Sequence, residues 1–473
     1  MRATPRAAGV VRGAGAGRLR RGVMGSSAIC GAGGECHTRR VSLLILLVGI
    51  VSALATANAF LPVRARGLII VGFFAGWLTI ELALHILVFN ATLIGVLAAY
   101  GGLAEPRGQI GLGLAVAASV GLVGLHLRSR GAAVTLREFY AASALDVGPD
   151  APRYPRSHVL FPFLAWLRRD IEVMRGRQFA EVGGKRLCLD IFRPRVPGEL
   201  RPALLQIHGG AWVIGFKEYQ GIPLLTHMAS NGWVGFNVDY RLSPTATFPE
   251  HLIDVKRALM WIREHAEELG VDPDFIVVTG GSAGAHLAAL VALTAGDPEY
   301  QPGFEAADTR VQAAVTFYGV YDLTNRLGSR IGARAKSYQG MLERLVMKRR
   351  FAEAPDLFAR ASPIDRIHAD APPFLVVHGS RDTMTPVEDA RHFVDTLRKV
   401  ANGPALYIEM QGAEHAFDTF PSVRTVQVIE ATERFLHAIF AAYVAGSRDA
   451  VGPAHTMQDT TNQASALVGA GGA

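Results

Sequence analysis

Residues 275–293 read FIVVTGGSAGAHLAALVAL, and this stretch decides how the rest of the chain is interpreted. Mostly apolar residues run into two glycines, a serine follows, and an apolar helical pattern begins directly after it. Residues 280–284 match G-x-S-x-G, the sharp turn that exposes a nucleophilic serine between a strand and a helix. A glycine-rich turn without any chemistry also fits, because the chain holds 51 glycines and short motifs match by chance. The residues that follow other strands must decide between the two.

From Arg177 onward, short apolar runs alternate with helical patterns, which is the rhythm of βαβ units and a largely parallel sheet. Helices are expected over residues 252–269 and 283–293. We therefore predict an α/β domain over residues 177–445, followed by a tail over 446–473 whose composition is typical of disorder. Seven runs have the length and composition of strands: KRLCLDIF, ALLQIH, VGFNVDY, FIVVTG, VQAAVTFYG, PPFLVVHG and ALYIEMQG.

Two further strand ends supply partners for Ser282. PPFLVVHGSRD brings Asp382 just beyond one strand, and ALYIEMQGAEHAF brings His415 into the loop after the last one. Because reactive groups of a parallel sheet gather at the carboxyl ends of its strands, these side chains are expected to meet. In that arrangement His415 is the general base and Asp382 orients it. Asp322, in FYGVYDL, also follows a strand and is the rival for the acid, although a structural or pocket-lining role suits it better.

Acyl transfer also needs hydrogen-bond donors for the developing oxyanion. LLQIHGGAW places His208, Gly209, Gly210 and Ala211 directly after a strand. The backbone N–H groups of Gly210 and Ala211, together with that of Ala283 after the serine, are predicted to form this hole. An ordinary Gly-Gly turn is the alternative. A triad and an oxyanion hole suffice for ester hydrolysis, so neither a metal nor an organic cofactor is expected.

The formal net charge of +7 comes from the start of the chain, because residues 1–40 carry eight arginines and a single acid, Glu35. No basic excess remains elsewhere, so a nucleic-acid partner is not expected. The basic tail precedes apolar stretches over residues 41–61, 68–103 and 110–127, each long enough to cross a bilayer. We expect about three transmembrane helices within 41–130, with a fourth short element left open. A signal peptide is the alternative for the first stretch.

The arginine-rich start favours a cytoplasmic N-terminus in a bacterial cell membrane. Three spans then put the α/β domain outside the cytoplasm, and four would reverse this. Glu81 and His85 share a helix face within the second apolar stretch, where ionisable groups are costly. A mutually satisfied pair inside a bundle explains them as well as a functional role does, so no role is assigned to them.

The ordered motifs resemble those of the hormone-sensitive-lipase-like bacterial esterases, which have the α/β-hydrolase fold. HGGAW resembles their HGGG motif with Ala211 as the departure, and DYRLSPTATFPEHLIDV and VDPDFIVVTGGSAGAHLAAL resemble two further family segments. Gly281 stands where the family often has an acid, and Thr245 departs similarly. The resemblance implies a helical cap, for which residues 323–371 have room, with residues 131–176 as a linker or second cap segment. Asp239, Tyr240 and Arg241 are expected to organise the oxyanion loop.

These features predict a membrane-anchored serine carboxylesterase or lipase that hydrolyses small-molecule or lipid esters through an acyl-enzyme. Two enzymatic alternatives keep the same site: an amidase such as a formamidase, and a deacetylase that acts on a lipid or glycan. A membrane-bound binding module without catalysis is the alternative from another class. It would be expected to have lost part of the triad or of the oxyanion loop, and the sequence retains both.

Overall fold

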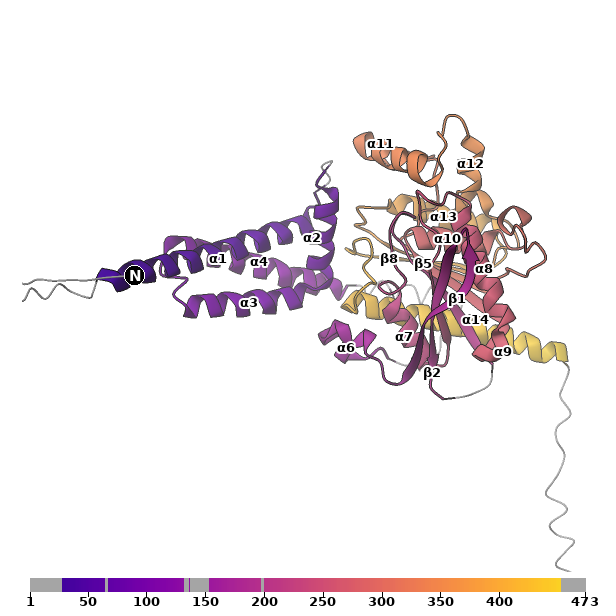
Figure 1. Ribbon diagram of the computed structural model, residues 1–473, viewed down its shortest axis with the longest axis horizontal. Coiled ribbons are helices and arrows are strands. Elements are labelled where there is room, and N and C mark those ends of the chain that lie inside the picture. The colour runs from indigo at the N-terminus through magenta and orange to yellow at the C-terminus, as the bar shows by residue number, and fades with distance from the viewer. Residues whose placement is uncertain (1–27, 64–66, 132–135, 137–152, 197–199, 452–473) are drawn as a thin grey trace, which may run out of the picture.

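The computed structural model describes residues 28–63, 67–131, 136, 153–196 and 200–451. The chain forms two parts that meet end to end (Figure 1). An elongated helical bundle comprises helices α1–α4, and a wider α/β domain comprises residues 171–451. Most of the predicted tail over 1–40, part of the predicted segment 131–176 and residues 452–473 of the C-terminal tail lie outside the described residues.

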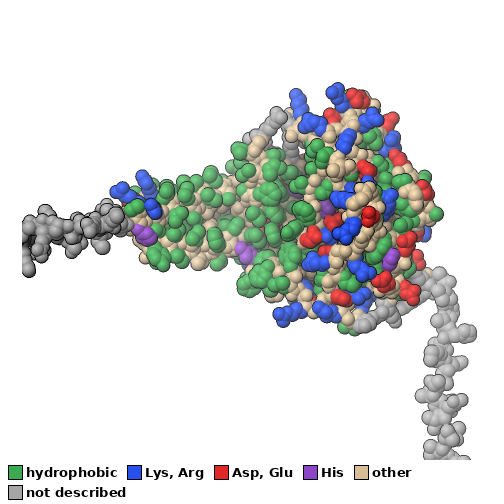
Figure 2. Space-filling view, viewed as in Figure 1, with side chains coloured by type: hydrophobic (Ala, Val, Ile, Leu, Met, Phe, Trp, Pro, Cys, Tyr) green, Lys and Arg blue, Asp and Glu red, His purple; other side chains and the backbone are tan. Residues whose placement is uncertain are grey.

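The helical bundle consists of α1 (Ala28–Phe60), α2 (Ile69–Glu81), α3 (Ala83–Ala99) and α4 (Pro106–Ser129). Within the described chain, Cys36–Phe60 and Pro106–Ser129 are long and apolar enough to cross a membrane. The second apolar stretch is broken, because α2 and α3 meet at an angle of 91°. Helices α1, α3 and α4 lie side by side, whereas α2 lies across their end, facing the α/β domain (Figure 1). On the face seen in Figure 2, the bundle surface is largely apolar, and its basic side chains lie at the end remote from the α/β domain.

The α/β domain is built on one eight-stranded sheet with the order β1-β2-β4-β3-β5-β6-β7-β8. Strands β1 and β2, and β2 and β4, pair antiparallel, and every other neighbouring pair is parallel. The strands are β1 (Ile171–Val182), β2 (Lys185–Pro194), β3 (Arg201–Ile207), β4 (Val234–Val238), β5 (Val271–Gly281), β6 (Ala313–Phe317), β7 (Phe374–Gly379) and β8 (Ala405–Met410). All seven predicted strands are present, and β1 is an addition that begins before residue 177.

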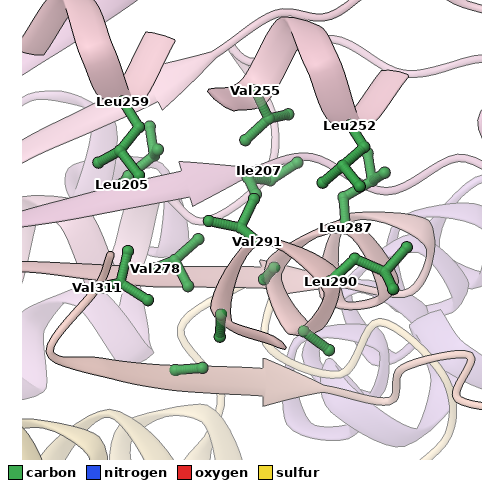
Figure 3. Packing of buried hydrophobic residues seen from close by; sticks show 14 of the residues in the cluster. Leu205, Ile207, Leu252, Val255, Leu259, Val278, Leu287, Leu290, Val291 and Val311 are labelled. Carbon is green, nitrogen blue, oxygen red and sulfur yellow. The ribbon is translucent and has the colours of Figure 1, made fainter. Parts of the chain in front are cut away.

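Helices cover both faces of the sheet. Successive strand residues point to opposite sides, so neighbouring residues of one strand pack against different helices. Leu205 and Val278 face α8 (Glu250–Glu264) and α10 (Ala283–Leu293), where Figure 3 shows their packing with leucines and valines of both helices. Leu204 and Val277, one residue earlier on each strand, face the opposite side and pack with residues of α7 (Ile222–Ser230) and α14 (Val423–Val451). Continuous apolar strands are what a doubly covered parallel sheet requires.

The remaining helical elements lie between the strands and before the sheet. The predicted helix over 252–269 is divided into α8 and α9, and the predicted helix over 283–293 is α10. Helix α14 reaches Val451, so the start of the predicted tail at residue 446 is helical. The other elements are α6 (Arg156–Leu160), η1 (Pro162–Trp166), α9 (Ala266–Leu269), η2 (Pro298–Tyr300), α11 (Gly332–Met341), the π-helical turn η3 (Leu342–Val346), α12 (Pro355–Arg360), η4 (Pro363–Arg366) and α13 (Val387–Val400).

Candidate active site

Ser282 lies on the sharp turn between β5 and α10. Its backbone has φ 57° and ψ −120°, a conformation that costs energy for a residue with a side chain. The neighbouring glycines are required by close packing. A Cβ on Gly284 would lie 2.1 Å from the carbonyl oxygen of Ile207, and one on Gly280 would lie 2.5 Å from the backbone of Gly284. The turn is therefore held tightly between two strands and its own helix, and Ser282 stays half-buried at the sheet edge.

Gly281, the departure from the family pattern, is fitted to Tyr318. A Cβ at position 281 would lie 2.6 Å from the Tyr318 hydroxyl oxygen. That hydroxyl donates a hydrogen bond to Asp418 Oδ1, and the Tyr318 ring centroid lies 4.6 Å from that of His415. Burial, the charge of Asp418 and the hydrogen bond to it hold the pKa of Tyr318 well above its ordinary value. Tyr318 therefore remains a neutral donor beneath the turn, in the space that a larger residue 281 would need.

Asp382 and His415 meet at the carboxyl ends of β7 and β8. His415 Nδ1 lies 2.7 Å from Asp382 Oδ2, and the Asp382 side chain is fully buried. Burial alone would raise the pKa of Asp382, but the facing His415 and the hydrogen bonds of His378 and His415 outweigh it and hold that pKa far below its usual value. The carboxyl is therefore an anion, and it can hold His415 in the tautomer that carries a proton on Nδ1.

The loop after β7 supports this carboxylate from the other side. The backbone N–H groups of Met384 and Thr385 each donate to Asp382 Oδ1 at 2.7 Å. The Thr385 hydroxyl lies 2.9 Å from Asp382 Oδ2, and His378 Nε2 lies 3.4 Å from the same oxygen. With every oxygen of the carboxylate engaged, its position relative to His415 is fixed before any substrate binds.

Glu414 is a second buried carboxyl beside His415. Its Oε1 accepts hydrogen bonds from the N–H groups of Thr383 (2.6 Å) and His415 (2.9 Å). Burial and the nearby charge of Asp382 raise the pKa of Glu414 to about 7. This side chain therefore ties the loop that carries His415 to the loop that carries Asp382.

The HGGAW loop lies against the serine turn. A Cβ on Gly209 would lie 3.1 Å from Ser282 Cβ and 2.6 Å from the Gly281 carbonyl oxygen, so the two segments touch through backbone. Gly210, Ala211 and Trp212 follow with φ of 119°, 53° and 60°. Such a run of left-handed residues is typical of a strained functional loop. Within the described part of the chain, the N–H groups of Gly210 and Ala211 have no acceptor, which leaves them available to a ligand.

The DYRL segment braces this loop. The Tyr240 hydroxyl donates to the His208 carbonyl oxygen at 3.0 Å, and the two rings stack with centroids 4.4 Å apart. Arg241 binds Asp254 of α8 through Nε (2.7 Å) and Nη2 (2.9 Å). Asp239 pairs with Lys217 at 3.0 Å. These contacts agree with the predicted organising role of the segment.

The rival acid is engaged elsewhere. Asp322 accepts hydrogen bonds from the N–H groups of Thr324 and Arg326, both at 2.8 Å, and it forms an ion pair with Arg326. Sequence reasoning did not identify Tyr318, Thr385, Asp418 or Glu414. Only Glu414 carried a local signal, because it directly precedes His415; the other three come to the site from a strand end and two loops.

The predicted cap segments contact the helix and loop behind the site. In the insertion over 323–371, the Ala361 carbonyl oxygen lies 2.7 Å from His286 Nε2 on α10, and Trp212 Nε1 lies 3.2 Å from His286 Nδ1. On the other side, Trp166 of η1 reaches the loop after HGGAW through a 3.4 Å contact with the Glu218 carbonyl oxygen.

The sheet order, the serine turn after β5 and the loop after β3 define an α/β-hydrolase. The family model described as BD-FAE matches residues 189–397. The probable carboxylic ester hydrolase LipM of Mycobacterium tuberculosis is 40% identical, over 86% of this chain and 96% of LipM. Esterase LipQ of the same organism is 47% identical over 54% of this chain and 61% of its own length. A solved esterase of Thermogutta terrifontis with bound butyrate is 28% identical and covers 57% of this chain and 95% of its own, with a TM-score of 0.49.

The chain belongs to the hormone-sensitive-lipase-like family of carboxylic ester hydrolases. It is therefore an enzyme, a carboxylic ester hydrolase.

Proposed function

We propose that this protein is a membrane-anchored serine carboxylesterase or lipase in which Ser282, His415 and Asp382 form the catalytic triad. The observation that carries the proposal is the buried 2.7 Å contact between His415 Nδ1 and Asp382 Oδ2, made at the same sheet edge as the strained turn of Ser282. A histidine whose Nδ1–H is held by a buried carboxylate has its Nε2 lone pair free to accept a proton from the serine hydroxyl.

The reaction follows from these positions. Ser282 Oγ attacks the ester carbonyl carbon while its proton passes to His415 Nε2. The negative charge that forms on the carbonyl oxygen is stabilised by the N–H groups of Gly210, Ala211 and Ala283. His415 then gives the proton to the leaving alcohol as the C–O bond breaks. Water, deprotonated by the same nitrogen, hydrolyses the acyl-enzyme and restores the serine.

The test uses p-nitrophenyl esters from acetate to palmitate and the purified full-length protein. Replacing Ser282 by alanine is expected to lower kcat by about 10⁶, as loss of the nucleophile does in other serine hydrolases. Ser157→Ala is the matched control, because Ser157 is exposed and lies outside the α/β domain. Retained activity in Ser282→Ala would remove Ser282 from the mechanism, whereas equal losses in both variants would point to misfolding.

Membrane anchoring is supported by the length and apolar character of Cys36–Phe60 and Pro106–Ser129. Arg39 and Arg40 lie in the N-terminal part of α1, and the N-terminal end of α1 is remote from the α/β domain (Figure 1). Since arginines flanking a span favour the cytoplasmic side, we place the N-terminus inside and the α/β domain outside the cytoplasm.

Two thiols at opposite ends of the molecule can test this orientation. Cys36 is exposed at the remote end of α1, and Ile331, 77% exposed, lies on the α/β domain. A membrane-impermeant maleimide applied to intact cells should label Ile331→Cys but should label Cys36 only after lysis. The unmodified protein gives the background from its own thiols. The reverse pattern would place the α/β domain in the cytoplasm, and labelling of both thiols in intact cells would contradict anchoring by spans.

A further inference from the structure

An apolar cavity lies outside the candidate active site, where the helical bundle meets the α/β domain. Its volume is ≈ 640 Å³, within the range of about 300–1,000 Å³ that is typical of small-molecule sites. Its walls come from the end of α2, the first turns of α3, the end of α4, residues 159–161 and the start of α14. The cavity is therefore built jointly by the bundle and the α/β domain.

One wall of this cavity continues onto the outer surface of the bundle. Leu84, Val88 and Phe89 of α3 line the cavity and are 40%, 64% and 65% exposed. Leu160 and Phe161 stand opposite and are 66% and 51% exposed. On the face seen in Figure 2, apolar side chains extend along the bundle as far as the junction. These exposed residues form the mouth of the cavity. If the bundle lies in a bilayer, as proposed above, the mouth opens toward the hydrocarbon.

The inner end of the cavity is polar and neutral overall. Arg424 and Glu81 line it as a buried ion pair, with Nη1 3.2 Å from Oε1 and both side chains 1% exposed. Ser422 donates to the other oxygen of Glu81 at 2.6 Å. Arg424 Nε is buried and has no acceptor within the described part of the chain. A buried donor without an acceptor is costly, so a ligand oxygen that accepts a hydrogen bond from this nitrogen would be stabilised there.

We propose that this cavity binds one acyl chain of a neutral membrane lipid, with the ester carbonyl oxygen accepting from Arg424 Nε and the chain running out along α3. A neutral ester fits better than a carboxylate or phosphate because Glu81 already neutralises Arg424, and a second anion would face Glu81 unpaired. Glu81 and His85, to which the sequence assigned no role, each find a partner at this site. Glu81 holds Arg424, and His85 Nε2 lies 3.0 Å from the Leu160 carbonyl oxygen on the opposite wall.

The proposal rests on insertion of the bundle into a membrane but does not depend on the identity of the nucleophile. The test therefore uses full-length Ser282→Ala protein in nanodiscs, so that the probe is not hydrolysed by the proposed mechanism. The probe is a monoacylglycerol with a diazirine in its acyl chain. After irradiation, mass spectrometry should locate saturable label on residues 84–89 and 159–161, and unlabelled monoacylglycerol should displace it.

Matched tryptophan variants separate this site from the general lipid coat. Val88→Trp should fill the cavity mouth and abolish the saturable label. Val120→Trp should leave it unchanged, because Val120 is 71% exposed on α4 and does not line the cavity. Equal effects of the two variants, or label that is unsaturable and spread over α1 and α4, would overturn the proposal.

A second pair of measurements tests the polar end. Arg424→Lys keeps a cation for Glu81 but removes the Nε donor, so affinity for the monoacylglycerol should fall about tenfold or more, the value of one hydrogen bond from a charged donor. An ether analogue, which lacks the carbonyl, should bind both proteins equally. Equal affinity of the ester for both proteins would overturn the assigned carbonyl contact. Extraction of the protein from membranes by alkaline carbonate would instead overturn membrane anchoring itself.

Discussion

The turn around Ser282 and the junction around Glu81 both hold buried polar groups, but they find their partners at different ranges along the chain. At the turn, strand, glycines and helix are contiguous in the sequence, and Gly284 and Gly281 pack against Ile207 and Tyr318, 77 and 37 residues away. At the junction, Glu81 binds Ser422 and Arg424, and Trp77 binds the Ala416 carbonyl oxygen, each more than 330 residues away. Both regions contact the segment 416–424, which directly follows His415. Tyr318, which packs against Gly281 of the turn, binds Asp418, and Trp77 and Glu81 of the junction bind Ala416 and Ser422. The junction thus extends the support of the candidate site into the helical bundle.

After Ser282 itself, Asp382 offers the largest expected effect on the site side of this comparison. Asp382→Asn should lower kcat by about 10³–10⁴, because a neutral amide no longer fixes the tautomer of His415 or stabilises its cation. Asp322→Asn is the matched control, since Asp322 is also buried and also follows a strand. Its kcat, measured with the same p-nitrophenyl ester, should stay within a few-fold of the parent. A larger loss in Asp322→Asn than in Asp382→Asn would exchange the roles assigned to the two acids.

Glu81 offers the largest expected effect at the junction. Glu81→Leu leaves the Arg424 cation buried without its partner and should lower the free energy of unfolding by about 3–5 kcal/mol. The double variant Glu81→Leu, Arg424→Leu should recover most of that loss, because an apolar pair replaces the ion pair without stranding a charge. Denaturation of the full-length protein in detergent measures both values. If the double variant is as unstable as the single one, the ion pair does not connect the two parts as described.

The same contrast explains what the sequence could and could not predict. The placement of Ser282, Asp382 and His415 at one edge of the sheet could be predicted, because parallel strands bring their carboxyl ends together and position after a strand implies proximity. The first strand was missed because β1 is half-exposed and has two register irregularities, which hide the apolar pattern. Tyr318 was missed because it occupies the space that a side chain at position 281 would need, and this contact cannot be read from the sequence near either residue. The partners of Glu81 depend on how α2 packs against the α/β domain, and no local sequence pattern predicts that packing.

The Glu414 carboxyl gives a pH-dependent effect of intermediate size. Its ordinary pKa is 4.5, and in the folded protein burial raises the pKa to about 7. Between these values the folded state keeps a proton that the unfolded state has lost, so stability falls as pH rises from 4.5 to 7 and then levels off. Glu414→Gln mimics the protonated form and should remove this loss, giving a gain of up to about 3 kcal/mol at pH 8 and little at pH 4.

Glu409→Gln serves as the control of opposite sign. The hydrogen bonds of Arg391 lower the pKa of Glu409, so its contribution to stability is present above the ordinary pKa and is lost as pH falls. Unfolding free energies of both variants across pH 4–8 should therefore diverge from the parent in opposite directions. A gain for Glu414→Gln that is the same at every pH would refute the proposed titration of Glu414.

Trp77 gives the smallest expected effect, and it tests whether the helical bundle positions the His415 loop. Trp77 Nε1 donates to the Ala416 carbonyl oxygen at 2.8 Å, its ring stacks on Phe420 with centroids 5.2 Å apart, and Ala416 itself has φ 59°. Trp77→Phe keeps an aromatic ring but removes a hydrogen bond worth about 1 kcal/mol. If that bond helps hold His415 in its reactive position, kcat should fall about fivefold while KM changes little. Trp261→Phe, on α8, should leave both constants unchanged. A change in KM alone would instead mean that Trp77 contributes to substrate binding, and parental kinetics would show that the loop holds its position without the bundle.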